Sequence, residues 1–223
     1  GAGLIFLKVG NDSTGGASTA AISAAIRDAV DVYNANIVTM SYGGFNTYND
    51  GSEEECQAVD YAFSKGAVAF ISAGNEADSS LHYSGTVTAN STTDYIKVNV
   101  GSTTQTLLYF YLNWFDGKGV NNNLDISLYD TNKNEMSTVP RFQAAESPRG
   151  TEAELIYLNA YITGPATYYM KVKNNANSSQ VFHIYSFYSD VIFENADPGY
   201  TVGSPATADN AIAVASYVTR PAW

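Results

Sequence analysis

Hydrophobic and polar positions follow two different patterns along the chain, and the change falls near residue 78. Before that point, short apolar runs at residues 4–9, 37–41 and 67–71 predict strands. Between them, apolar residues recur at helical spacing over residues 19–33 and 53–65, which predicts two helices. Strands that alternate with helices favour right-handed crossovers, so we expect an α/β layer with a parallel sheet.

Local signals support these helices and the last strand. Ser18 or Thr19 can cap the first helix, and the acidic start at Glu53 suits the dipole of the second. Residues 67–71 have the length of a parallel strand covered on both faces, although periodicity alone also fits a buried helical turn.

Beyond residue 78 the pattern changes to short alternating runs separated by Gly, Asn, Asp and Pro turns. These runs lie at residues 95–100, 107–114, 124–129, 155–161, 168–172 and 181–187, and no convincing helix is seen between residues 82 and 188. Such spacing predicts an antiparallel β-sandwich. A long structureless loop inside a compact domain is uncommon, so we expect an inserted domain at 78–196, flanked by a partial α/β domain at 1–77 and 197–223.

Two of the predicted α/β strands end in small residues that could face a ligand. Gly74 lets the backbone turn, which leaves Asn75 at the carboxyl end of a strand, where open α/β sheets place their ligands. The segment 41–44 (Ser-Tyr-Gly-Gly) follows the preceding strand and should share that rim. A primary amide can donate a hydrogen bond to a developing oxyanion without changing charge, whereas the alternative reading of Asn75 is an ordinary turn residue.

The segments 41–44, 72–75 (Ser-Ala-Gly-Asn) and 201–216, in this order, resemble the cleft segments of the subtilisin-like serine peptidases. The resemblance implies that Asn75 is the oxyanion-hole residue of a catalytic domain. It also implies that backbone groups at two strand ends bind an extended peptide, namely those of Ser41, Tyr42, Gly43, Ser72, Ala73 and Gly74. Ordinary βα turns are the competing reading of these glycine-containing segments.

The motifs that carry the Asp, His and Ser of that family do not occur in the sequence. Residues 1–9 resemble the strand that follows the family's His helix, so we expect the middle of a secreted serine endopeptidase, inactive by itself. The predicted insertion resembles jelly-roll or pre-peptidase β-sandwiches attached to bacterial proteases, from the runs at 114–130 and 166–172. The alternative function is a non-catalytic binding or scaffold protein derived from a subtilase.

Composition narrows the partners of the chain. A formal net charge of −11, with only 11 Lys plus Arg in 223 residues, opposes nucleic-acid binding. The resemblance to the peptidase family implies a peptide or protein substrate. No apolar stretch is long enough to span a bilayer. The acidic balance and abundant Tyr, Asn, Ser and Thr suit a secreted or cell-surface bacterial protein. The single cysteine, Cys56, shares helical spacing with Val59 and Phe63, which predicts a buried structural thiol.

Other kinds of site find less support in the sequence. His82 and His183 are the only histidines, and neither stands beside a recognisable nucleophile, so we expect structural roles for both. No zinc or phosphate-binding motif occurs, and no cofactor is expected. Asp116, Asp125 and Asp130, with the asparagines at 121–123, could supply oxygen ligands to calcium, but polar turns explain the same residues more simply.

Overall fold

The computed structural model describes residues 1–101, 106–162 and 164–216, with the side chains of residues 106 and 159–161 left undescribed. The chain folds into two compact units. Residues Gly1–Gly74 and Val202–Trp223 form the first unit, and residues Asn75–Thr201 form the second. The predicted boundaries were 77/78 and 196/197, and the part of the first unit at 217–223 lies outside the described residues. In the described part of the chain, no helix has the length and apolarity to cross a membrane.

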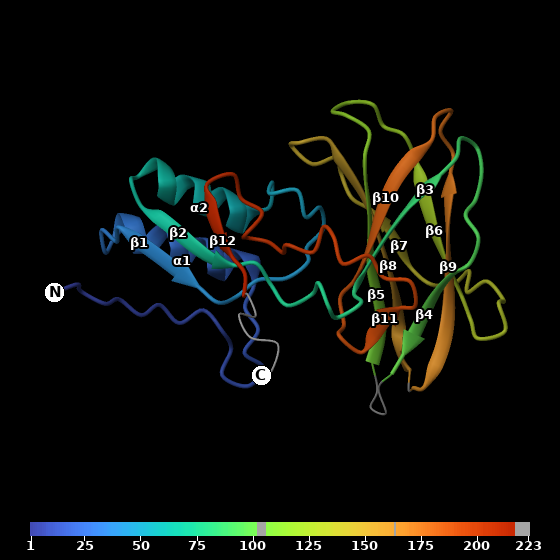
Figure 1. Ribbon diagram of the computed structural model, residues 1–223, viewed down its shortest axis with the longest axis horizontal. Helices are drawn as coiled ribbons and strands as arrows, with labels where there is room; N and C mark the ends of the chain where they lie inside the picture. The colour runs from blue at the N-terminus through green and yellow to red at the C-terminus, as the bar shows by residue number, and fades with distance from the viewer. Residues whose placement is uncertain (102–105, 163, 217–223) are drawn as a thin grey trace. The chain divides into compact units, whose positions relative to one another are not determined.

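The first unit contains a three-stranded parallel sheet and two helices (Figure 1). Strand β2 lies between β1 and β12 and pairs in parallel with both. The bounds are α1 Thr19–Asp31, β1 Ile37–Met40, α2 Glu54–Ser64, β2 Val68–Ser72 and β12 Ala211–Val214. The expected helices are therefore confirmed, and Ser18 caps α1 by accepting a hydrogen bond from the backbone N–H of Ala21 at 3.2 Å.

The apolar stripes of both helices pack together with one face of β2. Ile22 and Ile26 of α1, Val59 of α2, and Ala69 and Ile71 of β2 are all buried in one cluster. Alternation places Ala69 and Ile71 on the same side of the strand, and the helical spacing turns its apolar residues toward them. This side of the sheet therefore carries the core of the first unit.

Within the described residues, the opposite face of the parallel sheet is largely exposed. Phe70 and Ile212 occupy neighbouring register positions on that face and are 37% and 45% exposed, and Ile37 is 64% exposed. The expectation of a strand covered on both faces is therefore wrong for this chain. The strand expected at residues 4–9 is also wrong, because this segment has no strand conformation and Leu4 to Lys8 are exposed. A strand needs a neighbour to satisfy its backbone groups, and this apolar run pairs with none in the described residues.

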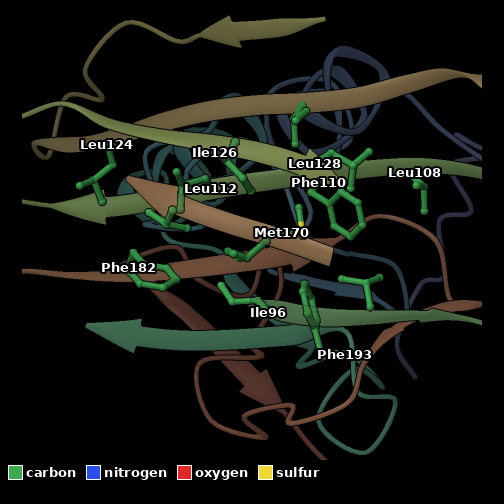
Figure 2. Packing of buried hydrophobic residues seen from close by; sticks show 14 of the residues in the cluster. Ile96, Leu108, Phe110, Leu112, Leu124, Ile126, Leu128, Met170, Phe182 and Phe193 are labelled. Carbon is green, nitrogen blue, oxygen red and sulfur yellow. The ribbon is translucent and has the colours of Figure 1, made fainter. Parts of the chain in front are cut away.

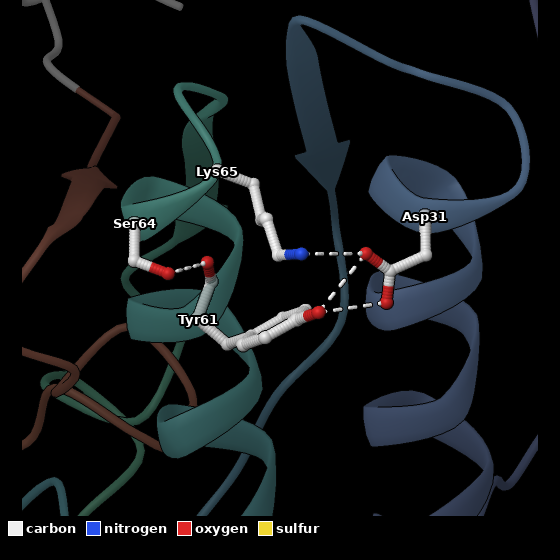
Figure 3. A network of polar contacts seen from close by, with 4 residues as sticks. All are labelled: Asp31, Tyr61, Ser64 and Lys65. Carbon is white, nitrogen blue, oxygen red and sulfur yellow. Dashed lines mark hydrogen bonds and ion pairs between the residues drawn. The ribbon is translucent and has the colours of Figure 1, made fainter.

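A polar network joins the outer ends of α1 and α2 (Figure 3). The hydroxyl of Tyr61 donates to both carboxylate oxygens of Asp31 at 2.9 Å, and Lys65 forms an ion pair with the same carboxylate at 3.4 Å. The Asp31 and Tyr61 partnership raises the pKa of Lys65, mainly through the interaction with Tyr61. Because the groups are exposed, we expect this network to orient the helices rather than to add much stability.

The second unit consists of two antiparallel sheets, one of five strands in the order β3-β10-β5-β8-β7 and one of four in the order β11-β4-β9-β6. Every run that was expected to be a strand in this part of the chain is one, with small shifts at the ends. The bounds are β3 His82–Val87, β4 Ile96–Val100, β5 Thr106–Phe115, β6 Leu124–Tyr129, β7 Arg141–Gln143, β8 Thr151–Ile162, β9 Ala166–Asn174, β10 Gln180–Ser186 and β11 Val191–Phe193. The sequence did not indicate β3, β7 and β11.

One apolar core lies between the two sheets of the second unit (Figure 2). It is built from alternate residues of the strands, such as Phe110 and Leu112 of β5 against Ile126 of β6 and Met170 of β9, all of which are fully buried. The intervening residues face outward, as the period of two requires.

A buried glutamate joins the two sheets at one edge. Glu154 of β8 is 5% exposed, and its Oε2 accepts a hydrogen bond from the backbone N–H of Ile126 at 2.8 Å. Arg141 of β7 donates to the carbonyl oxygen of Ile126 at 3.3 Å. Strand β6 is the last strand of its sheet, so these side chains satisfy backbone groups that would otherwise form an open edge.

The two ends of the second unit lie side by side. The backbone N–H of Phe193 donates to the carbonyl of Ser80 at 2.9 Å, and that of Asp197 donates to the carbonyl of His82 at the same distance. The first unit shows the matching arrangement, because the N–H of Gly203 donates to the carbonyl of Ala73 at 3.3 Å.

Candidate functional site

The carboxyl ends of β1 and β2 form one edge of the parallel sheet. The register pairs Met40 with Ile71, so Ser41 and Ser72 follow at the same rim. The backbone N–H of Ala73 donates to the carbonyl of Val214 at 2.9 Å, which holds the end of β2 against β12. The structure thus brings two of the predicted cleft segments to one edge.

The third segment predicted from the sequence reaches the same edge. Gly44 and Ser204 exchange two backbone hydrogen bonds, of 3.0 and 2.8 Å. A Cβ on Gly203 would lie 2.8 Å from the carbonyl oxygen of Gly44, and one on Gly43 would lie 2.8 Å from that of Ser204. Glycine is required at both places because the two backbones approach so closely.

Ser41 and Tyr42 take different positions at this edge. Ser41 is exposed, whereas Tyr42 is half-buried and its hydroxyl accepts a hydrogen bond from the backbone N–H of Ala17 at 2.7 Å. The Tyr42 side chain therefore fixes the segment before α1, and only its backbone remains as a candidate for contact with a ligand.

Asn75 follows the positive-φ residue Gly74 and is exposed. Gly74 has φ +102°, a conformation that an L-residue with a side chain adopts only under strain. The carbonyl of Asn75 accepts a hydrogen bond from the Ser79 hydroxyl at 2.9 Å. Within the described residues, its side-chain amide makes no hydrogen bond. Such an amide is available to donate to a ligand, and the oxyanion role assigned to it stays a prediction.

A buried polar cluster underlies the Gly44–Ser204 pair. Glu55 is 3% exposed, and its Oε1 accepts hydrogen bonds from Ser204 Oγ at 2.7 Å and from Asn46 Nδ2 at 2.8 Å. In the sequence, the acidic residues at 53–55 indicated only a favourable helix start. The signal for Glu55 was its helical spacing with Val59 and Ala62, which places all three on the buried face of α2.

Cys56 is a buried structural thiol, as predicted. It is fully buried, and its Sγ lies 3.1 Å from Ser204 Oγ and 3.4 Å from Thr207 Oγ1. Burial raises the pKa of the thiol to about 11, so it is protonated at neutral pH and is a poor nucleophile. The same helical stripe was expected to bury Phe63, and that is wrong, because Phe63 is 52% exposed.

The two histidines bond to one another within the second unit. His82 Nδ1 lies 3.0 Å from the carbonyl oxygen of Asp197, which can only accept, so this nitrogen carries the proton. His82 Nε2 then accepts from His183 Nδ1, also at 3.0 Å. Burial lowers the pKa of His82, and burial and then the charge of His82 lower that of His183 to about 4. The pair is therefore neutral and packed, as expected for structural histidines.

The three aspartates considered for calcium all accept hydrogen bonds from nearby backbone or side-chain N–H groups. Asp116 accepts from the N–H of Asn122 at 2.7 Å, Asp125 from two asparagine amides, and Asp130 from the N–H groups of residues 132 and 134. In the described parts of the chain, no three His, Cys, Asp or Glu side chains form a group that could hold a metal ion. Polar turns stay the prediction for these aspartates, with calcium binding as the alternative.

The chain was compared with protein families, curated proteins and solved structures. A family model described as the subtilase family matches residues 1–178, and no curated protein matches the chain. The solved structure of the Clostridium perfringens CspB protease is similar, with a TM-score of 0.72 and 17% sequence identity, over 95% of this chain and 48% of that chain. The Yersinia pseudotuberculosis-derived mitogen covers 52% of this chain and 95% of its own length, with 16% identity and a TM-score of 0.31.

The chain thus spans about half the length of the clostridial protease, whose likeness supports a common fold. The family match covers well over half of the 223 residues and includes the strand ends at 41–44 and 72–75. It confirms the resemblance drawn from those segments, and the chain belongs to the subtilase family.

Proposed function

We propose that this chain is the substrate-cleft segment of a secreted bacterial serine endopeptidase. In this proposal, other parts of the protein supply the catalytic Asp, His and Ser, and the second unit is a jelly-roll-like domain inserted into the peptidase. The observation that carries the proposal is the meeting of the three family-like segments at one edge of a parallel sheet, with Asn75 directly after it.

Asn75 has the chemistry that an oxyanion donor needs. Its amide is exposed and makes no hydrogen bond in the described residues, and the positive φ of Gly74 fixes where the chain turns. A fixed amide donor stabilises the negative charge that develops on the scissile carbonyl oxygen, and it does so more strongly in the transition state than in the ground state.

The backbone groups around this amide suit an extended peptide. Ser41 to Gly43 and Ser72 to Gly74 lie at the ends of adjacent parallel strands, where a substrate could pair with them as an added strand.

The exposed face of the parallel sheet also supports a longer peptidase. Ile37, Phe70, Ile212 and Val214 are between 37% and 64% exposed on neighbouring strands. A cluster of apolar residues on a sheet is normally covered by further chain or by a partner. Additional segments of the peptidase would provide such a cover.

The main test is Asn75→Ala in the longer protease that contains this chain. We expect turnover to fall by roughly 10² to 10³ with KM nearly unchanged, a magnitude found for the equivalent asparagine of another subtilase rather than derived from this structure. Asn75→Asp should also be poor, because a carboxylate would place a negative charge where the oxyanion forms. Asn132→Ala, at an exposed asparagine in a turn of the second unit, is the control.

Steady-state kinetics with circular dichroism on all variants decide the question. An Asn75→Ala protein with unchanged kcat would reduce Asn75 to a turn residue. The chain by itself should show no peptide hydrolysis and no labelling by a serine-directed phosphonate. Stoichiometric labelling of the isolated chain would contradict the proposed division of the catalytic residues.

A further inference from the structure

The second unit has an open surface pocket of about 390 Å³, called the cavity below, that takes no part in the proposed peptidase chemistry. Two loops line it. The loop between β5 and β6 contributes residues 121–123, all asparagine, and the loop between β9 and β10 contributes residues 175–178, which are Asn, Ala, Asn and Ser. Its volume lies within the range of roughly 300–1,000 Å³ that is typical of small-molecule sites.

The two loops are held rigidly against each other. Asp125 accepts hydrogen bonds from Asn123 Nδ2 at 3.2 Å and from Asn175 Nδ2 at 2.7 Å, so one carboxylate bridges both loops. The backbone N–H of Asn175 donates to the carbonyl of Asn123 at 3.0 Å. Trp114, buried in the core, donates from its indole nitrogen to the carbonyl of Asn122 at 3.1 Å. The lining is therefore organised before any ligand arrives.

Buried Asn174 holds the loop of residues 175–178 in place through hydrogen bonds to backbone groups. It is fully buried, and its Nδ2 donates to the carbonyls of Val87, Thr88 and Ser178 at 2.8–3.2 Å, while its Oδ1 accepts from the N–H of Ala176. An asparagine that satisfies four backbone groups holds the loop in one conformation, which lowers the entropy cost of binding.

The bridge by Asp125 determines which polar atoms the cavity can offer. Because the amide nitrogens of Asn123 and Asn175 are engaged by Asp125, their carbonyl oxygens remain as acceptors. The Asn122 side chain makes no hydrogen bond within the described residues and can both donate and accept. The cavity thus carries several neutral donors and acceptors close together on a fixed frame.

This lining excludes several classes of ligand. No described lining residue is charged, so an anion finds no countercharge, and both oxygens of Asp125 already accept hydrogen bonds, which leaves little for a cation. Ala176 is the one apolar lining residue among those described, so an apolar ligand or a peptide side chain would find no pocket. A peptide would also lack a strand edge to pair with.

From this lining we propose that the cavity binds a neutral carbohydrate. Each hydroxyl of a sugar both donates and accepts hydrogen bonds. A side-chain amide can do the same, because its NH₂ group donates and its carbonyl oxygen accepts. The binding is weak, because no aromatic ring lines the cavity in the described residues and water competes for each hydrogen bond. Loops at the end of a β-sandwich are a frequent place for such recognition.

The test is a titration of the isotopically labelled full chain by NMR, which resolves the side-chain NH₂ groups of asparagines. Maltotriose and triacetylchitotriose are the two sugar probes, and triglycine and calcium chloride are the competing probes. We expect saturable shifts of the cavity asparagine signals with at least one sugar. Asn122→Ala should weaken that binding by roughly two- to tenfold, the effect of one lost hydrogen bond.

Asn134→Ala is the matched control, because Asn134 Nδ2 donates to Asp130 at 3.1 Å in a turn remote in sequence from the cavity. This variant should bind the sugar as the unchanged chain does. The proposal is overturned if neither sugar shifts the cavity signals, or if Asn122→Ala binds as tightly as the control. Shifts with triglycine or calcium in the absence of a sugar response would also overturn it.

Discussion

The buried carboxyl of Glu154 should make the stability of the chain depend on pH in an unusual direction. Burial raises the pKa of Glu154 from its ordinary value of 4.5 to about 7, with a smaller contribution from the charge of Asp125. The hydrogen bond from the Ile126 N–H and the charge of Arg141 act the other way but do not cancel the effect of burial. The folded state therefore binds this proton more tightly than the unfolded state.

The sign and size of the effect follow from this difference. Below pH 4.5 the carboxyl is protonated in both states and has no linkage to folding. Between pH 4.5 and about 7 only the unfolded state loses the proton, so the free energy of unfolding falls as the pH rises. At about 1.4 kcal/mol for each pH unit, the loss is at most about 3.5 kcal/mol, and partial solvent screening brings it nearer to 2.

Glu154→Gln isolates this contribution, because the amide is neutral at every pH and its oxygen can still accept from Ile126. We expect the variant to match the unchanged chain near pH 4.5 and to exceed it by about 2–3 kcal/mol at pH 8. Urea unfolding at each pH, followed by tryptophan fluorescence, gives the comparison, since Trp114 is buried on β5, the strand that pairs with the Glu154 strand β8. Glu135→Gln, at an exposed glutamate, is the control. Curves for Glu154→Gln and the unchanged chain that stay parallel from pH 4.5 to 8 would refute the reasoning.

Three further predictions concern packing. Phe182→Ala should lower the free energy of unfolding by about 3–5 kcal/mol in urea titrations, whereas Val181→Ala, 56% exposed on the same strand, should change it by less than about 0.5. The Cys56 thiol, with its pKa near 11, should react with a disulfide reagent at pH 8 far more slowly in the folded chain than in urea, and equal rates would contradict its burial. Gly203→Ala should destabilise the chain by about 1–3 kcal/mol because its Cβ would meet a backbone oxygen at 2.8 Å. Gly16→Ala, whose Cβ would make only an ordinary contact of 3.5 Å with Thr14 Oγ1, should be tolerated, and thermal unfolding of both variants makes the comparison.

Much of the fold could be predicted because long apolar patterns determine which residues are buried. The helices and the longer strands of the second unit were predicted from period and turn residues alone. Residues 4–9 show the limit of this reasoning, because an apolar run indicates a need for cover but cannot reveal whether a neighbouring strand is present.

Strand β3 was missed for a related reason. It contains Ser84, Gly85 and Thr86, which suggest a turn, yet Gly85 is needed there because a Cβ would lie 2.8 Å from the ring of Phe182. The glycine is needed because of Phe182, which is almost a hundred positions away in the sequence. A local sequence pattern therefore cannot reveal the need for it.

Part of the candidate site was also predictable from the sequence, and part was not. The rule that ligands lie at the carboxyl ends of parallel strands located Ser41 and Ser72 at one rim from sequence alone. The Glu55–Ser204 contact was not predictable, since it joins residues 149 positions apart through a buried hydrogen bond. The cavity at residues 121–123 and 175–178 was also missed, because it exists only where two loops meet.

The adjoining ends of the second unit have a consequence for how such proteins diversify. The parallel sheet releases the chain after Ala73 and takes it back at Gly203, two residues joined by a backbone hydrogen bond, and the second unit starts and finishes on bonded segments of its own. For the parallel sheet, the more than one hundred intervening residues therefore span no greater distance than a tight turn would. A gene could acquire, exchange or discard the whole module in one event, without changing the path of any strand on either side of the junction.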